Sequence, residues 1–333
     1  NGSISLGQDH LLWGYGQNGR MVLSERAPVY PYIRLDYQPL KWLRFHYAHS
    51  WLQSNLIDSV HRYPTTGGTP PDYRERYIPK FMATHSLQFT PTKGLDIAIG
   101  ESIVYSESLD IGFLMPLNFF KIYDNNRSNY NLQAGSNGQF FLGISSRNHL
   151  KKTHLYATWF IDEVRFGDIF NKKTRRNQFG YNIGASVTDV FLPYLTLSAE
   201  YSRINPFVYS NLIPAQLYTH HDYSLGDWMG NNNDRWNVQV QYTPIPKLRT
   251  LLRFNQMRKG GPGNVFLQYN AVPQPEFLFD YQKKRQDVFF QVRYEWLNSV
   301  YFNGSYQWQN QTLANGQNQR GSTIQLGLQV GLR

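Results

Sequence analysis

The sequence predicts an all-β fold, a transmembrane antiparallel β-barrel of about 14–18 strands whose lumen is partly filled by loops. The first observation is a two-residue period, plainest over 323–332, where bulky apolar side chains alternate mainly with Gln or Gly. The second is composition, because 16% of the residues are aromatic while the mean hydropathy is only -0.52. The third is that no stretch approaches the roughly 18 uncharged apolar residues of a membrane helix. A chain of this kind that spans a bilayer does so as a barrel.

Strand-like segments with this period follow one another along the whole chain. About 15 can be counted, and because closed bacterial barrels prefer an even number of strands, we expect 14–18. The segments are 3–8, 20–24, 31–38, 41–53, 83–90, 94–106, 138–147, 153–164, 178–188, 194–204, 235–243, 246–258, 286–297, 299–311 and 322–332.

The connections between these segments are of two lengths. Several are very short and rich in turn-forming residues, which is typical of periplasmic turns: Pro39-Leu40, 91–94, Pro193 and 243–246. The long polar connections are 54–76, 124–138, 205–234 and 259–285, and we expect them to be outer loops or lumen-filling segments. Within the first of these, the Pro- and Gly-rich stretch 63–71 is expected to be irregular. Residues 1–333 are expected to form one domain.

The apolar faces of neighbouring segments carry many aromatic residues. In 236–242 the even positions are Trp, Val, Val and Tyr, and 288–296 and 300–308 repeat this pattern. A soluble sandwich could show the same alternation, but aromatic residues crowded near strand ends are typical of the interfacial girdles of a membrane barrel. The expected location is the bacterial outer membrane.

The charge balance indicates an anionic partner. There are 33 Lys and Arg against 23 Asp and Glu, a formal net charge of +10, and no cysteine. A basic surface or lumen would attract acidic polysaccharide, lipopolysaccharide phosphate or nucleic acid. The basic residues are dispersed through strands and resemble no nucleic-acid-binding module, so we expect no nucleic acid. The alternative is that these charges merely solvate the lumen and loops. The lack of cysteine fits an exported protein without disulfides.

Catalytic, metal and cofactor sites are not expected. No G-x-S-x-G elbow occurs, and neighbouring acids such as Asp162 and Glu163 would point to opposite faces of a strand. The tract 220–234 contains two histidines and three aspartates. However, adjacent histidines in a strand diverge, and the aspartates do not follow a calcium-loop spacing.

Several motifs, in order over roughly the first two-thirds of the chain, resemble the capsule assembly protein Wzi family. They are Leu6-Gly7-Gln8-Asp9-His10-Leu11-Leu12-Trp13-Gly14-Tyr15-Gly16, Met21-Val22-Leu23-Ser24-Glu25-Arg26-Ala27-Pro28, Arg76-Tyr77-Ile78-Pro79-Lys80-Phe81 with His85, Gly100-Glu101, Leu117-Asn118-Phe119, Phe160-Ile161-Asp162-Glu163 and Glu200-Tyr201-Ser202-Arg203-Ile204-Asn205-Pro206-Phe207.

The resemblance implies an outer-membrane barrel that helps to hold capsular polysaccharide at the cell surface, as a lectin and not as an enzyme. Two features depart from the family. The chain is short and has no evident helical segment ahead of its first strand, and its last third carries no motif that can be aligned.

Glycan sites combine aromatic faces that stack on sugar C–H groups with fixed polar side chains, and acidic sugars add a need for Arg or Lys. The candidate glycan-binding residues are Trp13, Arg76, Tyr77, Lys80, Glu200, Arg203, Tyr209 and Trp228. Arg44 could also neutralise a uronate. The alternative is that Arg34, Asp36, Arg44 and His46 point inward and form a salt-bridge lattice across the lumen.

Three functions remain open from the sequence. The first is a surface-polysaccharide-binding or anchoring barrel, the second a structural or accessory subunit of a larger outer-membrane complex, and the third a general porin. The partners expected are acidic surface polysaccharide or lipopolysaccharide, outer-membrane lipid and, under the second function, other outer-membrane proteins.

Overall fold

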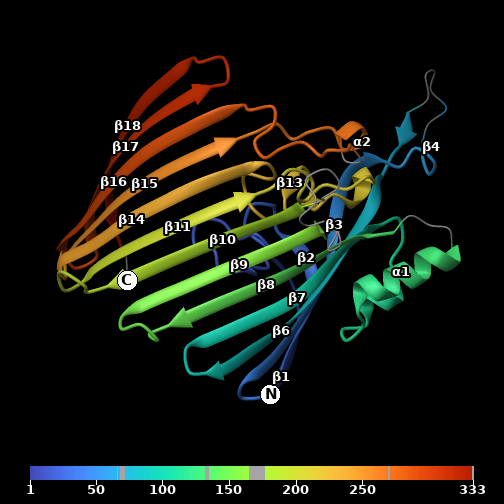
Figure 1. Ribbon diagram of the computed structural model, residues 1–333, viewed down its shortest axis with the longest axis horizontal. Coiled ribbons are helices and arrows are strands. Elements are labelled where there is room, and N and C mark those ends of the chain that lie inside the picture. Colours follow the sequence, from blue (N-terminus) through green and yellow to red (C-terminus); the bar gives the residue numbers. More distant parts are fainter. Residues whose placement is uncertain (66, 68–71, 132–134, 165–176, 269–270, 332–333) are drawn as a thin grey trace.

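A single antiparallel sheet of fourteen strands dominates the computed structural model (Figure 1), which describes residues 1–65, 67, 72–131, 135–164, 177–268 and 271–331. Each strand pairs with the sheet strands next to it in sequence, and the first and last strands have one such neighbour each. In order they are β1 Gly2–Asp9, β2 Tyr30–Leu40, β3 Leu43–Ile57, β6 Tyr77–Thr92, β7 Leu95–Ser106, β8 Asn137–Arg147, β9 Thr153–Val164, β10 Asn177–Thr188, β11 Leu195–Ile204, β14 Asn233–Ile245, β15 Leu248–Lys259, β16 Lys283–Leu297, β17 Val300–Leu313 and β18 Asn318–Val330. The all-β prediction is confirmed, at the lower end of the predicted strand number.

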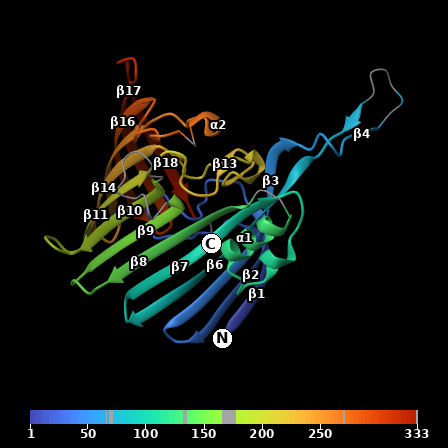
Figure 2. The ribbon, with the colours of Figure 1, turned by 45° about the vertical axis from the view of Figure 1, so that its right-hand side comes forward.

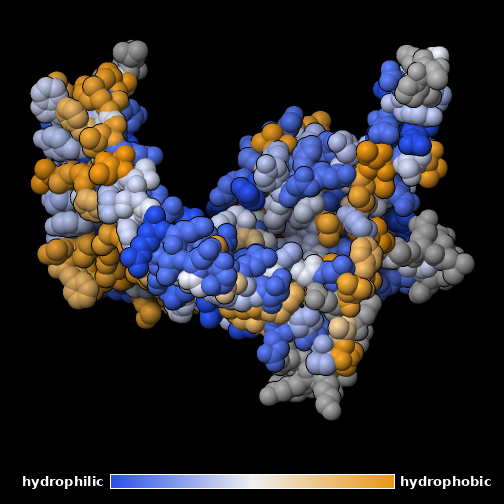
Figure 3. Space-filling model, turned by 90° about the horizontal axis from the view of Figure 1, so that it is seen from above, coloured by the Kyte–Doolittle hydropathy of each residue, from blue (hydrophilic) through white to orange (hydrophobic). Residues whose placement is uncertain are grey.

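The sheet curls around a hollow, and β1 and β18 are its two edges (Figure 2). In the part of the sheet at the left of Figure 3, hydrophobic side chains lie mainly on the outer side and hydrophilic ones toward the hollow. The alternation predicts this division. On β18, for example, Leu326 points outward and is 86% exposed. Lipid can cover a wide exposed apolar face of this kind.

Short turns join the strands at one end of the sheet, where the sequence predicts periplasmic turns. Two residues separate β2 from β3, β6 from β7 and β14 from β15. In the second of these turns Gly94 has a φ of +89°, and a Cβ there would lie 2.5 Å from the carbonyl oxygen of Arg147. Only glycine fits this position without strain.

The predicted strand 20–24 is wrong. Leu23 makes one bridge with Trp13, and Met21, Val22 and Leu23 are all fully buried. A strand with one solvent-exposed face would bury only every second residue. Because three consecutive residues are buried here, the segment is surrounded on all sides. It belongs to residues 10–29, which fold into the hollow of the sheet.

The filled hollow confirms the prediction of lumen-filling loops. Residues 10–29 pack with residues 205–232 against the inner sheet face. The second segment contains the 3-10 helix η3, Pro214–Gln216, and the paired strands β12, Thr219–His220, and β13, Tyr223–Ser224. The buried cluster comprises Leu11, Met21, Val22, Leu23, Ala27, Tyr30, Ala48, Leu52, Met82, Val104, Phe141, Phe160, Ile204, Val208, Tyr209, Tyr218 and Leu225.

The connection after β7 packs against the outer face of the sheet. It contains the 3-10 helix η1, Ile111–Leu114, and the helix α1, Phe120–Asn131, which includes part of the predicted loop 124–138. Phe113 and Phe120 pack on outward-facing side chains of β3, β6 and β7. Glu101 of β7 accepts hydrogen bonds from the backbone amides of Phe120 (2.6 Å) and Lys121 (3.3 Å), and so caps the helix.

Two other long connections also contain regular structure that the sequence did not predict. Tyr63–Pro64 (β4) pairs with Tyr73–Arg74 (β5), inside the region 54–76. The connection between β15 and β16 contains the helix α2, Val265–Gln268. Among the described residues, no helix has the length and apolar character needed to cross a membrane.

β6 begins at Tyr77 and not at the predicted 83. Pro79 made the start of this strand hard to recognise, because proline cannot donate to a ladder. In the structure the pairing of β6 with β7 begins only at Lys80 with Ser106. Pro79 therefore has a strand neighbour on one side only.

Candidate functional site

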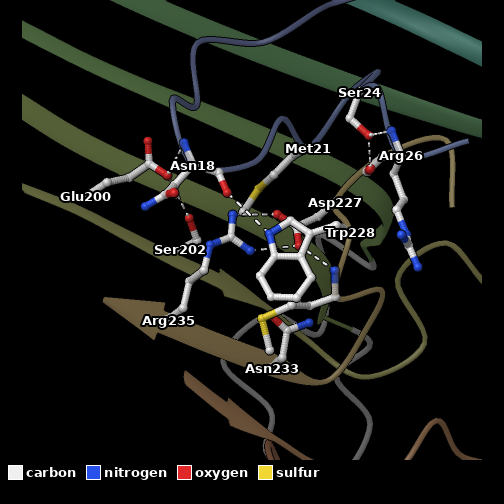
Figure 4. Close-up of polar contacts among 12 residues, drawn as sticks. Asn18, Met21, Ser24, Arg26, Glu200, Ser202, Asp227, Trp228, Asn233 and Arg235 are labelled. Carbon is white, nitrogen blue, oxygen red and sulfur yellow. Dashed lines mark hydrogen bonds and ion pairs between the residues drawn. The ribbon is translucent and has the colours of Figure 1, made fainter. Parts of the chain in front are cut away.

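Two segments fill the hollow: residues 10–29 are called the inner segment below, and residues 205–232 the second inner segment. Glu200 of β11 holds the inner segment in place (Figure 4). Its buried carboxylate accepts hydrogen bonds from the backbone amides of Gln17 (2.7 Å) and Asn18 (3.3 Å) and from the Tyr156 hydroxyl (2.7 Å). With these donors satisfied and only 4% of the residue exposed, the carboxylate is a poor candidate for direct sugar contact.

Tyr209 and Trp228 also bind the inner segment. The Tyr209 hydroxyl donates to the carbonyl of Met21 at 2.8 Å, and the Trp228 indole nitrogen donates to the carbonyl of Asn18 at 3.3 Å. Burial, reinforced by the nearby Asp227 carboxylate, raises the pKa of Tyr209 well above its ordinary value. Tyr209 has no accessible ring face, whereas Trp228 is 44% exposed and can stack on a ligand.

A buried ion pair lies beneath Trp228. The Arg235 guanidinium donates to both carboxylate oxygens of Asp227, at 2.8 and 2.7 Å, and lies 5.5 Å from the Trp228 ring. Gly19 passes directly over the pair, and a Cβ there would lie 2.3 Å from Nη2 of Arg235. Arg235 was not among the residues predicted from the sequence. Because Trp236 was expected to face outward, its strand neighbour Arg235 could have been expected to face inward.

Trp13 lines a cavity of about 220 Å³ between the inner segment and the sheet. Arg34 and His46 lie in its wall. Both contact Asp36, with Arg34 Nε at 2.7 Å and His46 Nδ1 at 2.5 Å. Three residues of the predicted lattice are therefore joined, but between the neighbouring strands β2 and β3 and not across the lumen. Arg44 faces the same side but makes no ion pair within the described part of the chain.

Lys80 points into the filled hollow. It is 2% exposed, and its ammonium donates to the Thr219 hydroxyl at 3.1 Å. Next to Thr219, His220 accepts a hydrogen bond from the backbone amide of Gln53 through Nδ1 at 3.0 Å. Burial, helped by His221 and Lys80, lowers the pKa of His220 to about 4. These contacts attach the second inner segment to β3 and β6.

Arg203 lies on the outer face of the sheet, opposite to Glu200. The two residues are three positions apart in β11, so their side chains leave opposite faces. The Arg203 guanidinium lies 3.7 Å from the centre of the Phe277 ring, and its Nε donates to the Asn205 side chain at 3.1 Å. The motif 200–207 therefore serves two separate environments.

The predicted Arg76 lies on an arm, residues 58–65, 67 and 72–77, that projects beyond the end of β3 (Figure 2). The arm holds an open cavity of about 540 Å³. Arg76 Nε lies 3.1 Å from Asp58. Although desolvation opposes it, hydrogen bonds from His61 and Arg76 keep the pKa of the Asp58 carboxyl below its ordinary value. The cavity is lined by His61, Arg62, Tyr63, Arg74, Glu75 and Arg76.

Exposed aromatic rings accompany these arginines. Tyr77, a predicted residue, is 49% exposed, and Tyr63 and Tyr73 are similarly open. Arg62 lies 5.0 Å from the centre of the Tyr73 ring. Sequence reasoning missed these partners because it treated the stretch as irregular. The sequence does contain a pattern that could have indicated them: an arginine and a tyrosine are neighbours at each end of this stretch, at 62–63 and 73–74.

The predicted residues thus divide among separate places. Arg76 and Tyr77 both lie on the arm. Glu200 and Trp228 both hydrogen-bond to the backbone of Asn18, and Trp13 lines the cavity between the inner segment and the sheet. No hydrogen bond or ion pair among the described residues joins the motif 76–81 to the motif 200–207. The arm is an exposed place that combines arginines, aromatic rings and a cavity, the combination that an acidic sugar requires.

Comparison with known proteins gives a family and a fold. The model of the family described as capsule assembly protein Wzi matches residues 1–326. No curated protein matches the chain. Among solved structures, the Escherichia coli outer-membrane protein Wzi, described as a carbohydrate-binding β-barrel involved in group 1 capsule assembly, aligns with a TM-score of 0.62 at 13% identity, covering 99% of this chain and 68% of that one.

Other similar structures are also outer-membrane or porin-like proteins. OccK3 of Pseudomonas aeruginosa aligns with a TM-score of 0.47 at 12% identity, covering 99% of this chain and 76% of that one. The outer membrane channel DcaP of Acinetobacter baumannii has a TM-score of 0.41 at 9% identity, covering 99% of this chain and 97% of that one.

Proposed function

Because the chain belongs to the capsule assembly protein Wzi family, we propose that it is a non-enzymatic barrel that binds acidic polysaccharide at the bacterial cell surface. The observation that carries this proposal is the arm, where three arginines and the exposed Tyr63 line an open cavity. The structural relative described as carbohydrate-binding supports the same class of ligand.

The bacterial outer membrane is the location that goes with this fold. The apolar outer face of the sheet meets lipid there, and the short turns face the periplasm. The arm leaves the opposite end of the sheet, between β3 and β6. It therefore extends on the side of the cell surface, where a surface polysaccharide is present.

The chemistry of the arm favours a sugar with carboxylates. Guanidinium groups bind carboxylates through two parallel hydrogen bonds, and tyrosine faces stack on sugar rings. The arm is not uniformly basic, because Glu75 lies 3.8 Å from Arg62 and Asp58 lies 3.1 Å from Arg76. Within the described residues Arg74 makes no ion pair, and it is the best placed of the three arginines to meet a uronate.

A general porin suits the structure less well. Residues 10–29 and 205–232 occupy the hollow that an open channel would need, and they are fixed there by buried contacts of Glu200, Tyr209 and Arg235. This inner packing agrees better with a binding barrel than with free diffusion through the lumen.

The experiment compares two charge-removing variants on an array of acidic and neutral bacterial glycans. Arg62→Ser with Arg74→Ser removes two cations from the arm, and Lys93→Ser with Lys247→Ser removes two from the short turns. We expect the arm variant to bind uronate-containing glycans about tenfold more weakly, equivalent to about 1.4 kcal/mol, and the turn variant to bind as the wild type does. Equal binding by both variants would refute the role of the arm.

A further inference from the structure

A row of cations lies on the outer face of the sheet, away from the arm and the hollow. Arg203 pairs in register with Asp234, Asp234 with Arg258, and Arg258 with Lys284. Residues directly opposite each other on neighbouring strands share a face. Arg320 of β18 lies on the same face but two positions nearer the membrane centre, because its partner Asn310 pairs with Gln286 and not with Lys284. The four cations Arg203, Arg258, Lys284 and Arg320 are called the outer basic row below.

Contacts with outward aromatic rings confirm which face the row occupies. The tilted rings of Tyr201 and Trp236 are in contact on the outside with their centres 4.6 Å apart, and Trp236 is 48% exposed. The Tyr201 hydroxyl donates to Asp234 at 3.1 Å. Asp234 in turn accepts from Nε of Arg258 at 3.0 Å. The row therefore shares the face of the sheet that meets lipid.

The row lies at the level of lipid headgroups. Each of its residues is within two positions of a strand end, at the end of the sheet that carries the long connections. Tyr201 and Trp236 come two positions closer to the membrane centre than Arg203 and Asp234, respectively. Aromatic girdles mark the boundary between hydrocarbon and headgroups. Arg203, Arg258 and Lys284, one step beyond the girdle, therefore face the phosphates of the outer leaflet, and Arg320 lies level with Trp236.

Few carboxylates neutralise the row. Arg258 is paired with Asp234, whereas Arg203, Lys284 and Arg320 make no ion pair within the described parts of the chain. Unpaired cations beside a lipid surface attract anionic headgroups.

A cavity of about 610 Å³ adjoins Arg203 on the same face. Its walls combine apolar and polar side chains, from β10, from the end of β11 and from residues 273–277, which lie over the outside of the sheet. Its polar groups are Arg203, Asn205, Gln274 and Glu276. The apolar lining residues are Phe179, Tyr181, Pro206, Pro273, Pro275 and Phe277. A cationic group beside apolar rings fits an anionic amphiphile.

We propose that the outer basic row and this cavity bind lipid A, the phosphorylated lipid of lipopolysaccharide. Its phosphates contact Arg203, Lys284 and Arg320, and part of its apolar body lies in the cavity under residues 273–277. The site is separate from the arm, and it does not depend on the proposed polysaccharide function.

The partner is a membrane lipid and not a soluble anion because of where the row lies. A soluble phosphate could reach cations on the outer loops, but these cations are continuous with the lipid-facing girdle. Arginine is well suited to the contact, because its planar group binds phosphate in a bidentate manner and stacks on rings at the same time, as Arg203 does on Phe277.

The test measures lipid binding to detergent-purified full-length protein by native mass spectrometry. The probes are bisphosphorylated lipid A, chemically dephosphorylated lipid A and inorganic phosphate as a competitor. Lys284→Glu with Arg320→Glu reverses two outward charges. Lys283→Glu with Arg249→Glu is the control, because it also reverses two charges, both on the inner face, one next to Lys284 on β16 and one on β15.

We expect wild-type protein to retain bisphosphorylated lipid A at least tenfold better than the dephosphorylated form, and the outward variant to lose most of this preference. The inward control should keep it, and equimolar inorganic phosphate should not displace the lipid. Equal retention of both lipids by the wild type, which needs no variant to fold, would overturn the proposal. Displacement by phosphate, or equal loss in the control, would also overturn it.

Discussion

At the scale of single residues, the inner face of the sheet works mainly as an anchor. Glu200, Tyr209 and Lys80 are of residue types that often bind sugars. In this structure the polar atoms of each form hydrogen bonds with backbone or hydroxyl groups of the segments that fill the hollow. The residue types therefore do not identify the ligand site. Exposure does, and it separates Arg76 and Tyr77 on the arm from these three.

Replacing Asp227 by Asn should destabilise the protein strongly. The change leaves the Arg235 guanidinium, 3% exposed, without its carboxylate. Breaking a buried pair in this way costs about 3–5 kcal/mol. Urea unfolding in detergent measures the loss. Glu25→Gln, which breaks an exposed pair with Arg20 at 3.5 Å, is the control and should cost less than about 1 kcal/mol. Equal effects would show that the buried pair carries no special stability.

Acid should loosen the attachment of the second inner segment through His220. Its pKa is about 4 in the folded protein and near 6.5 when exposed. As pH falls, the unfolded chain binds the proton first, so the stabilisation present above pH 6.5 is lost between about 6.5 and 4. Lys80 and His221, which face the ring, oppose its protonation.

The unfolding midpoint measured from pH 8 to pH 4 tests this dependence. His220→Gln, which cannot titrate, should flatten part of the profile, whereas His61→Gln on the exposed arm should not. A profile that is unchanged by His220→Gln would contradict the assignment.

At the scale of elements, the inner segment 10–29 depends on a few polar anchors. Glu200→Ala removes the acceptor of two backbone amides and of the Tyr156 hydroxyl. We expect amide hydrogen exchange at Gln17 and Asn18 to speed up at least tenfold, while exchange in β14 stays unchanged. Glu25→Ala, in the same segment but exposed, is the control. Unaltered exchange in the Glu200 variant would mean that apolar packing alone holds the segment.

The sequence predicts strands well where one face of the strand is polar and the other is apolar. The segments 235–243, 286–297 and 299–311 appear as β14, β16 and β17 with the predicted outward faces. The prediction failed where that contrast is missing. Residues 20–24 are buried on all sides, α1 lies against the outside of other strands, and the pairing of β4 with β5 joins residues across a turn-rich stretch. These features depend on tertiary contacts that local periodicity does not record.

At the scale of the whole molecule, the barrel architecture and the family followed from periodicity and ordered motifs, whereas the location of the site did not. Sequence motifs group residues by position along the chain, but a strand sends adjacent residues to opposite faces. Glu200 and Arg203 are separated in this way, and Arg76 and Lys80 likewise end on the arm and in the hollow. The prediction of one domain over residues 1–333 stays a prediction.

The three surfaces of the molecule divide the work. The apolar outer face meets lipid, the inner segments fill the hollow, and the arm extends the chain beyond the end of the sheet that carries the long connections. Because the arm is joined to the sheet only through β3 and β6, its ligand binding should be separable from the stability of the sheet.

The most direct test of the account is equilibrium binding of an acidic capsular oligosaccharide to the detergent-purified protein, compared with the same oligosaccharide after its carboxyl groups have been reduced to alcohols. Binding by arginines predicts that the acidic form binds at low salt and weakens as ionic strength rises, and that the reduced form binds at least tenfold more weakly. Equal affinity for the two forms, or no binding of either at any salt concentration, would contradict it.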